Sequence, residues 1–379
     1  MSTTGDKALQ LLRDLIAVDS INPSLVPGAA GEAAVARTIA EAMRGMGLTV
    51  ETQDAAPGRP NVVGTLDGRG PGRSLMFCGH IDTVGVTGMK APFDPAERNG
   101  RIYGRGSQDM KSGVAAMIDA ARVIAESGGL AAGKLVIACV VDEEHASIGA
   151  DALVTRWRAD AAVVTEPTDL QIAIAHKGFE WVEIETEGVA AHGSRPREGR
   201  DAIRLMARIL TGLDALDQRL QSRSSHPLLG TASLHASLIE GGRELSSYPD
   251  RCHLQMERRT IPGEAPGVAA TEVDELLTSL RADDPDFKAA SKAMLARSPY
   301  EIAANHELPQ AMIRAAGSSA SAIGMSFWTD AAILGDAGIP SILFGPTGAG
   351  LHSVEEWVET QSVLKCRDAL VNLSRDWCR

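Results

Sequence analysis

The chain is organised around SLMFCGHID (residues 74–82), GRGSQDMKSG (104–113) and VIACVVDEEHASIG (136–149). Each segment joins an apolar run or a glycine-rich bend to His or carboxylate side chains. In an α/β sheet, ligand-binding groups gather at the carboxyl ends of strands. The segments therefore predict one crevice at that end of a sheet. The side chains expected there are His80, Asp82, Asp109, Glu143 and Glu144.

Outward from this region, helix-like and strand-like segments alternate, which is the pattern of a largely parallel sheet with helices on both faces. Apolar residues recur at helical spacing in 9–16 and 32–46, and further helices are predicted at 112–126 and 147–158. The strands predicted between them are 48–52, 61–66, 74–77, 134–141 and 161–164.

Near residue 178 the pattern changes to that of a small two-layer domain. Residues 180–187 alternate charged and apolar side chains, as a half-exposed strand does. The expected order is strand, helix, strand, strand, helix, strand, the split βαβ pattern. These elements are predicted at 180–187, 201–216, 231–239, 251–259, 267–281 and 287–295.

The first pattern returns after Ser298. Helices are predicted at 306–316, 330–337 and 360–376, with a buried strand at 341–344. The simplest organisation is an α/β catalytic domain made of 1–177 and 299–379, interrupted by an α+β domain at 178–298.

Length, charge and cysteine content narrow the class of protein. A chain of 379 residues is long enough for about two domains, and its net charge of −12 disfavours a nucleic-acid surface. No apolar stretch approaches the ~20 residues of a membrane span, and no N-terminal signal pattern is present. The five cysteines form no CxxC pair, so we expect a cytoplasmic protein with reduced thiols and with Cys78 and Cys139 in its core.

The candidate residues also have simpler interpretations. His80 and Asp82 lie on the same side of an extended segment, so Asp82 is either a ligand or the carboxylate that orients a metal-bound imidazole. A surface histidine beside a helix-capping aspartate is the alternative. Asp109 precedes a helix, where Asp is a common N-cap, although a carboxylate also bridges two cations. Glu143 and Glu144 suit a division between proton transfer and metal binding, or a charged loop.

Glu166 and His352 each follow a predicted buried strand and extend the same set. The glycines of 345–350 lack the Gly-Lys-Ser/Thr of a phosphate-binding loop, so a turn that brings His352 inward is expected. His, Asp and Glu without Cys suit catalytic zinc or a similar divalent ion better than structural zinc.

Seven segments occur in the order in which the M20 metallopeptidases carry their motifs. The chain resembles that family, which includes acetylornithine deacetylase and glutamate carboxypeptidase, from about residue 10 to its end. The matching segments are GHIDTV (79–84), GRGSQDMKSG (104–113), DEEHASIGA (142–150), TEP (165–167), AHGSRP (191–196), ERRTIPGE (257–264) and LHSVEEWV (351–358).

The resemblance implies a pair of zinc ions, with Co²⁺ or Mn²⁺ as alternatives. Glu143 is then the expected general base, and Asp82 the carboxylate that orients its neighbouring imidazole. The implied ligands are Asp109 as the bridge, His80 and Glu166 on one ion, and Glu144 and His352 on the other.

The inserted domain resembles the family's lid, which is also its usual dimerisation domain, so a homodimer is expected. The resemblance implies that His192 stabilises the oxyanion and that Arg259 holds a substrate carboxylate. Arg258 is the alternative, because a shift of one residue in strand register exchanges their faces.

Three further positions bear on substrate binding. Relatives often carry Asn where GGRELSSYPD (241–250) has Ser246, and a serine lacks the reach of a carboxamide. Thr329 and Asp330 either line the pocket or cap a helix.

The expected function is hydrolysis of the amide bond of an N-acyl-amino acid, as in acetylornithine deacetylase. A dipeptidase or a carboxypeptidase resembling glutamate carboxypeptidase would use the same site. A catalytically silent binding protein is the remote alternative, and it predicts loss of a ligand or of the base. The partners expected are a small-molecule substrate and a second copy of the chain, with neither nucleic acid nor membrane.

Overall fold

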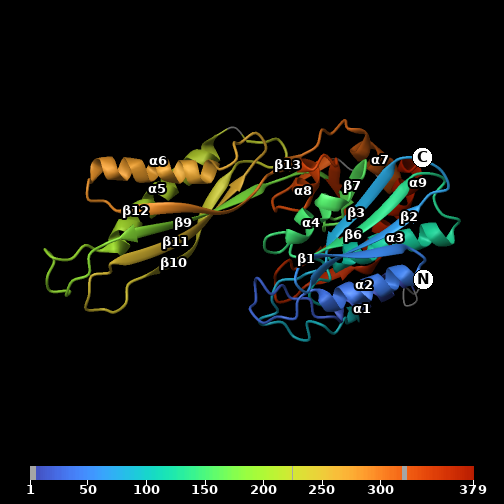
Figure 1. Cartoon of the computed structure of the whole chain (residues 1–379), viewed down its shortest axis with the longest axis horizontal. Helices are drawn as coiled ribbons and strands as arrows, with labels where there is room; N and C mark the ends of the chain where they lie inside the picture. Colours follow the sequence, from blue (N-terminus) through green and yellow to red (C-terminus); the bar gives the residue numbers. More distant parts are fainter. Residues whose placement is uncertain (1–5, 224, 318–321) are drawn as a thin grey trace. The chain divides into compact units, whose positions relative to one another are not determined.

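The computed structural model describes residues 6–223, 225–317 and 322–379, and the chain divides into two compact units (Figure 1). The first unit comprises Met1–Ile174, Ile302–Gly324 and Thr329–Arg379. The second comprises Ala175–Glu301 and Met325–Trp328.

A nine-stranded sheet has the order β1-β2-β6-β3-β7-β15-β8-β13, with β14 paired to β8. Its central strands β6, β3, β7 and β15 are parallel, and only β2 and β8 oppose that direction along this path. The predicted α/β class with a mostly parallel sheet is therefore confirmed. The bounds are Thr49–Ala56 (β1), Arg59–Asp67 (β2), Ser74–His80 (β3), Lys134–Val140 (β6), Ala161–Val164 (β7), Ile172–His176 (β8), Tyr300–Glu301 (β13), Ala322–Met325 (β14) and Ser341–Leu343 (β15).

Helices cover both faces of this sheet. On β2, Gly64 faces Met43 of α2, whereas the Asn61 side chain donates to the Gly149 carbonyl of α4. Because side chains alternate along a strand, α2 and α4 lie on opposite faces. Helices α1, α3, α7 and α9 pack together with α2 as one layer, and α8 packs with α4. The bounds are Lys7–Ile16 (α1), Ala33–Gly45 (α2), Lys111–Glu126 (α3), Ile148–Arg156 (α4), Glu307–Ala316 (α7), Ala331–Asp336 (α8) and Thr360–Trp377 (α9).

A second, small antiparallel sheet in the first unit was not predicted. Its order is β16-β17-β5-β4, and it pairs strands that are far apart in the sequence. Strands of two or three residues carry too little hydrophobic periodicity to be recognised. The sheet places the segment before Asp109 beside the hairpin that carries His352. Its strands are Glu97–Arg98 (β4), Arg101–Tyr103 (β5), Gly348–Ala349 (β16) and Trp357–Glu359 (β17).

The second unit has the predicted strand–helix–strand–strand–helix–strand order. Its antiparallel sheet, β10-β11-β9-β12, packs one face against α5 and α6. Val182 and Ile184 of β9 alternate inward and meet Met206 and Ile209 of α5 in a buried core. The bounds are Gly178–Glu187 (β9), Ala202–Ser222 (α5), Ser233–Gly241 (β10), Arg251–Thr260 (β11), Val268–Asp283 (α6) and Ala289–Arg297 (β12).

The five cysteines are free and buried, including Cys78 and Cys139 in the core as predicted. The cytoplasmic location inferred from them stays a prediction. Among the described residues, no helix is both long enough and apolar enough to cross a membrane.

One buried histidine predicts that the stability of the fold depends on pH. The side chain of His176 is fully buried, lies edge-on to Trp328 with ring centroids 6.2 Å apart, and contacts the Lys177 carbonyl through Nδ1 at 2.9 Å. Burial disfavours the imidazolium and lowers the pKa of His176 to about 4.

We therefore expect acid to destabilise the fold through His176. An unfolded histidine titrates near pH 6.5, so between about pH 6.5 and 4 the unfolded chain binds a proton that the folded chain does not. The stabilisation is complete above this window and is lost within it, by about 3 kcal/mol. Chemical denaturation across this range should show a shallower pH dependence for His176→Phe. The exposed His235 provides the control His235→Phe, which should keep the slope of the parent chain.

Candidate active site

The ends of several elements of the first unit deliver polar side chains to one place. His80 is the last residue of β3, Glu143 and Glu144 follow β6, and Glu166 follows β7. Asp109 stands just before α3, and His352 lies in the hairpin between β16 and β17. The sequence argument expected this convergence because parallel strands end at a common edge.

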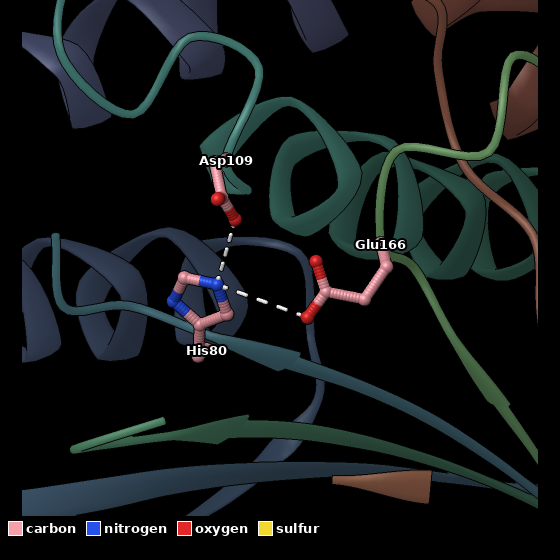
Figure 2. Close-up of side chains that lie close together, drawn as sticks. All are labelled: His80, Asp109 and Glu166. Atoms are coloured by element: carbon pink, nitrogen blue, oxygen red, sulfur yellow. Dashed lines mark hydrogen bonds and ion pairs between the residues drawn. The ribbon is translucent and has the colours of Figure 1, made fainter. Parts of the chain in front are cut away.

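His80, Asp109 and Glu166 form the first of two triads (Figure 2). The Nε2 atom of His80 lies 3.0 Å from Asp109 Oδ1 and 3.8 Å from Glu166 Oε1. Figure 2 shows the imidazole edge directed toward both carboxylates. One ligand atom from each residue therefore faces a shared point.

Asp109 also belongs to the second triad, with Glu144 and His352. The His352 Nε2 atom lies 3.0 Å from Glu144 Oε2 and 3.4 Å from Asp109 Oδ2. The two oxygens of Asp109 are thus divided between the two histidines, Oδ1 toward His80 and Oδ2 toward His352. This is the arrangement that a carboxylate bridging two ions requires.

The carboxylates and imidazoles of the cluster shift one another's protonation. Burial by itself raises the pKa of Asp109, but hydrogen bonds from His352 and His80 outweigh it and hold that pKa below its ordinary range. The contacts with Asp109 and Glu144 raise the pKa of His352 to about 10. Burial, followed by the charge of Asp109, raises the pKa of Glu144 to about 7. The negative charge of these carboxylates therefore favours the binding of positive charge in the cluster.

Divalent cations fit this donor set. In each triad the ligand atoms lie within 4.8 Å of one another, and all of them are imidazole nitrogens or carboxylate oxygens. The buried Oε1 atom of Glu144 has no hydrogen-bond partner among the described residues, so a lone pair remains for a cation. Nitrogen and oxygen donors without thiolates are typical of catalytic zinc and of related first-row metals.

Glu143 lies beside the triads without belonging to either. Its Oε2 atom is 3.9 Å from His80 Nε2, and its backbone N–H donates to Asp82 Oδ1 at 3.2 Å. Burial and the neighbouring acids, Glu166 among them, raise the pKa of Glu143 well above its usual value. A carboxylate close to the ligands but outside both triads is suitably placed for proton transfer.

Asp82 stands behind the first triad and is fully buried. On the side of the ring opposite to Asp109, His80 Nδ1 lies 3.1 Å from the Asp82 main-chain carbonyl and 3.6 Å from Asp82 Oδ1. The Asp82 Oδ2 atom accepts from the Asn22 side chain at 2.7 Å and from the Glu144 backbone at 3.2 Å. Asp82 therefore fixes the imidazole and the Glu143-Glu144 backbone together.

A chain of buried polar groups continues from Asp82 into the interior. Asn22 donates to Asp142 Oδ1 at 3.1 Å as well as to Asp82. Arg59 donates to the same Asp142 oxygen at 2.7 Å and forms a forked pair with Glu32. Asp142 has a left-handed backbone, with φ of +69°, directly before Glu143 and Glu144. These buried polar groups hold the turn at Asp142 in place.

Sequence reasoning missed these supporting residues. Asp142 lies in the motif DEEHASIGA and Glu356 in the motif LHSVEEWV. Each has another acidic residue next to it, and nothing in the sequence distinguishes the roles of the neighbouring acids. In the structure Glu355 is exposed and Glu356 is buried. Asn22 and Arg59 come from segments without any motif, and their partners lie 60 and 83 residues away.

The other predicted site residues belong partly to the second unit. There the exposed His192 accepts the Ser194 backbone N–H at its Nδ1 atom, at 3.2 Å. A neutral imidazole in this state carries its proton on Nε2. Ser246 is exposed, and its carbonyl accepts from the Gly193 N–H at 2.6 Å, which ties its loop to the His192 turn.

The two arginines of β11 have different surroundings. The Arg258 side chain is fully buried and forms ion pairs with Glu264 at 2.6 Å and Glu272 at 2.7 Å. The Arg259 side chain is 31% exposed, pairs with Glu257 and lies over the Phe179 ring. Arg258 is thus committed to internal partners, whereas Arg259 presents donors at the surface of the second unit.

Thr329 and Asp330 lie at the start of α8 in the first unit and are buried. The Thr329 hydroxyl accepts from the Ala331 N–H at 3.3 Å, so Thr329 contributes to the helix start. The negative charge of Asp330 helps raise the pKa of both Glu143 and Glu166, after burial and the nearer charges. Asp330 is therefore part of the electrostatic surroundings of the cluster.

Comparison with known proteins gives one consistent family. The sequence profile of peptidase family M20/M25/M40 matches residues 76–376. Acetylornithine deacetylase from Proteus mirabilis (strain HI4320) is 29% identical over 380 residues, covering 98% of this chain and 96% of that protein. N-formyl-4-amino-5-aminomethyl-2-methylpyrimidine deformylase from Bacillus subtilis (strain 168) is 28% identical over 415 aligned positions, covering 98% and 95%.

A solved structure agrees in fold. The YXEP protein of Bacillus subtilis, described as a dinuclear metal-binding peptidase from the M20 family, superposes with a TM-score of 0.74 at 15% identity. The match covers 98% of this chain and 97% of that one.

Proposed function

The chain belongs to peptidase family M20/M25/M40, and from that membership we propose that it is a zinc-dependent hydrolase that removes the acyl group of an N-acyl-amino acid. Its hydrolase activity on amide bonds follows from the family and from its deacetylase relatives. The observation that carries the proposal is the division of the two Asp109 oxygens between His80 and His352.

We assign the two triads to two zinc ions, with Co²⁺ or Mn²⁺ as substitutes. His80, Asp109 and Glu166 would hold one ion, and Asp109, Glu144 and His352 the other. When bound, such a pair supplies Lewis acidity toward the scissile carbonyl and lowers the pKa of the attacking water. Asp82 keeps the His80 ring oriented, because it lies against the Nδ1 side of that ring.

Glu143 is the proposed general base. It takes the proton of the attacking water and delivers it to the leaving amine, as a carboxylate at hydrogen-bonding distance from the reacting atoms does. In the second unit, the proton on His192 Nε2 makes that atom a donor suited to a developing oxyanion. The Arg259 guanidinium is the proposed partner of the substrate carboxylate.

The names of two relatives favour deacylation. One acts as an acetylornithine deacetylase and the other as a deformylase of a formylated aminopyrimidine. A dipeptidase or carboxypeptidase remains the alternative, because the same constellation hydrolyses a peptide amide. Arg259, whose neighbour Arg258 is paired internally, supports a substrate with a free carboxylate in either class, so the choice of a deacetylase rests on these relatives.

A substrate panel tests the choice. The zinc-loaded protein should turn over N-acetyl-amino acids with a higher kcat/KM than dipeptides. Arg259→Ala should raise KM for N-acetyl-amino acids roughly 10–100-fold, the effect of losing a charged hydrogen bond, while N-acetyl-amino acid amides change little. The exposed Arg243 gives the control Arg243→Ala. Turnover of dipeptides alone would overturn the deacylase assignment.

Glu143→Ala should separate proton transfer from metal binding. We expect both ions to remain, measured by elemental analysis, while kcat falls by roughly 10²–10⁴-fold. Loss of an ion would mean that Glu143 and Glu144 exchange roles.

His192→Ala should likewise lower kcat at full metal content, and unchanged turnover would remove His192 from the reaction.

The chain is also proposed to form a homodimer through the second unit. Strand β10 is an edge strand of its sheet, and Leu238 and Ile239 on it are 66% and 56% exposed. Apolar edge strands are sites of pairing with a second chain. Sedimentation equilibrium should show a dimer that Ile239→Lys weakens, and a monomer at all concentrations would contradict the proposal.

A further inference from the structure

Glu356 is a buried carboxylate of the first unit to which the reaction gives no role. Its residue is 1% exposed, and each of its oxygens accepts two hydrogen bonds. Oε1 accepts the backbone N–H groups of Gln108 at 2.8 Å and Asp109 at 3.0 Å. Oε2 accepts the Gly106 N–H at 3.1 Å and the Arg105 guanidinium at 2.6 Å.

All four donors belong to residues 105–109, the loop that ends at the bridging aspartate. Three of them are backbone groups, so the carboxylate fixes the path of the main chain itself. The Asp109 N–H is one of the three, which leaves the Asp109 side chain little freedom to turn away from the two histidines. Glu356 therefore acts on Asp109 without touching its carboxylate.

The same residue is joined to the loop that carries His352. Glu356 is the last residue of that loop before β17, and its own carbonyl accepts the Gly104 N–H at 3.1 Å. Arg105 extends the connection, because it donates to the Ser353 carbonyl at 3.0 Å as well as to the Glu356 carboxylate. Two ligands of the second triad, Asp109 and His352, are thus held by one buried pair.

We propose that Glu356, with Arg105, is a positioning residue. It sets the affinity of the site for its two metal ions by holding Asp109 and His352 in place relative to each other. The inference rests on the proposed dinuclear site. Partners that hydrogen-bond the ligands of a metal site typically change its affinity by 10–100-fold when they are lost.

The geometry makes Glu356→Gln an informative change. An amide has one accepting oxygen and one NH₂ group, whereas both oxygens of Glu356 face two N–H donors. Either orientation of the amide therefore sets its NH₂ against two donors. The volume is unchanged, so the substitution alters hydrogen bonding without creating a cavity.

Asp119 provides a matched control. It is a buried carboxylate on α3 that accepts from Arg122 at 2.6 Å and from Arg367 at 3.2 Å, and neither partner belongs to the loops that carry Asp109 and His352. Asp119→Asn removes a buried acid–arginine contact of the same unit. A residue with a purely structural role should resemble it in both stability and metal affinity.

The experiment is competition of the full-length protein against a chromophoric chelator with Zn²⁺, together with thermal unfolding of the metal-free proteins. We expect Glu356→Gln to raise the Kd of at least one ion roughly 10–100-fold. Asp119→Asn should lower the Tm while binding both ions with the affinity of the parent chain. Equal affinities for Glu356→Gln and the parent chain would overturn the inference and leave the proposed function intact.

Two further outcomes are separable. Failure of the parent chain to bind two ions would contradict the proposed function itself. If Glu356→Gln does not fold, Arg105→Lys keeps the positive charge but lacks the donors that reach both Ser353 and Glu356. It should then weaken zinc binding in the same assay, and unchanged affinity in Arg105→Lys would count against the inference.

Discussion

The structure depends on one shared carboxylate. Asp109 presents one oxygen to His80 and the other to His352, and these three residues come from a loop, a strand end and a hairpin. Holding a carboxylate against two imidazoles requires its backbone to be fixed to within about 0.5 Å. The parallel centre of the large sheet fixes His80 and Glu166, and the small antiparallel sheet brings the other two segments together. The architecture around the cluster is therefore a means of aligning three short segments.

Such alignment gathers more negative charge than a protein interior normally holds. Buried carboxylates are tolerated only when each has a compensating partner, because desolvation of an unpaired charge is costly. Arg59 compensates Glu32 and Asp142, the residue directly before Glu143. Arg105 likewise compensates Glu356. Within the cluster the imidazoles of the buried His80 and of His352 provide this compensation, and the pKa of His352 is raised to about 10.

The sequence located the residues of the two triads better than the residues that hold them in place. His80, Glu144 and Glu166 lie at the end of an apolar run or shortly after one, and these runs located them. The long elements of both units were found within a few residues of their ends. Strand β8 and the short strands were missed because a few residues show no period. Arg59 and Glu356 could not have been assigned, since their roles arise only when distant segments meet. Arg258 and Arg259 are adjacent on one strand. Only the observed ion pairs showed which of the two side chains faces the interior.

The position of β15 in the sheet has a consequence for biosynthesis. This strand, Ser341–Leu343, lies between β7 and β8, although both neighbours precede it by more than 160 residues. While the ribosome is still making the second unit, β15 has not yet been synthesised. The edge of β7 that β15 will occupy is therefore still without it. His352 emerges later still. A nascent or truncated polypeptide that ends before residue 341 thus carries the residues of the first triad but neither the strand that closes the sheet nor the last ligand of the second.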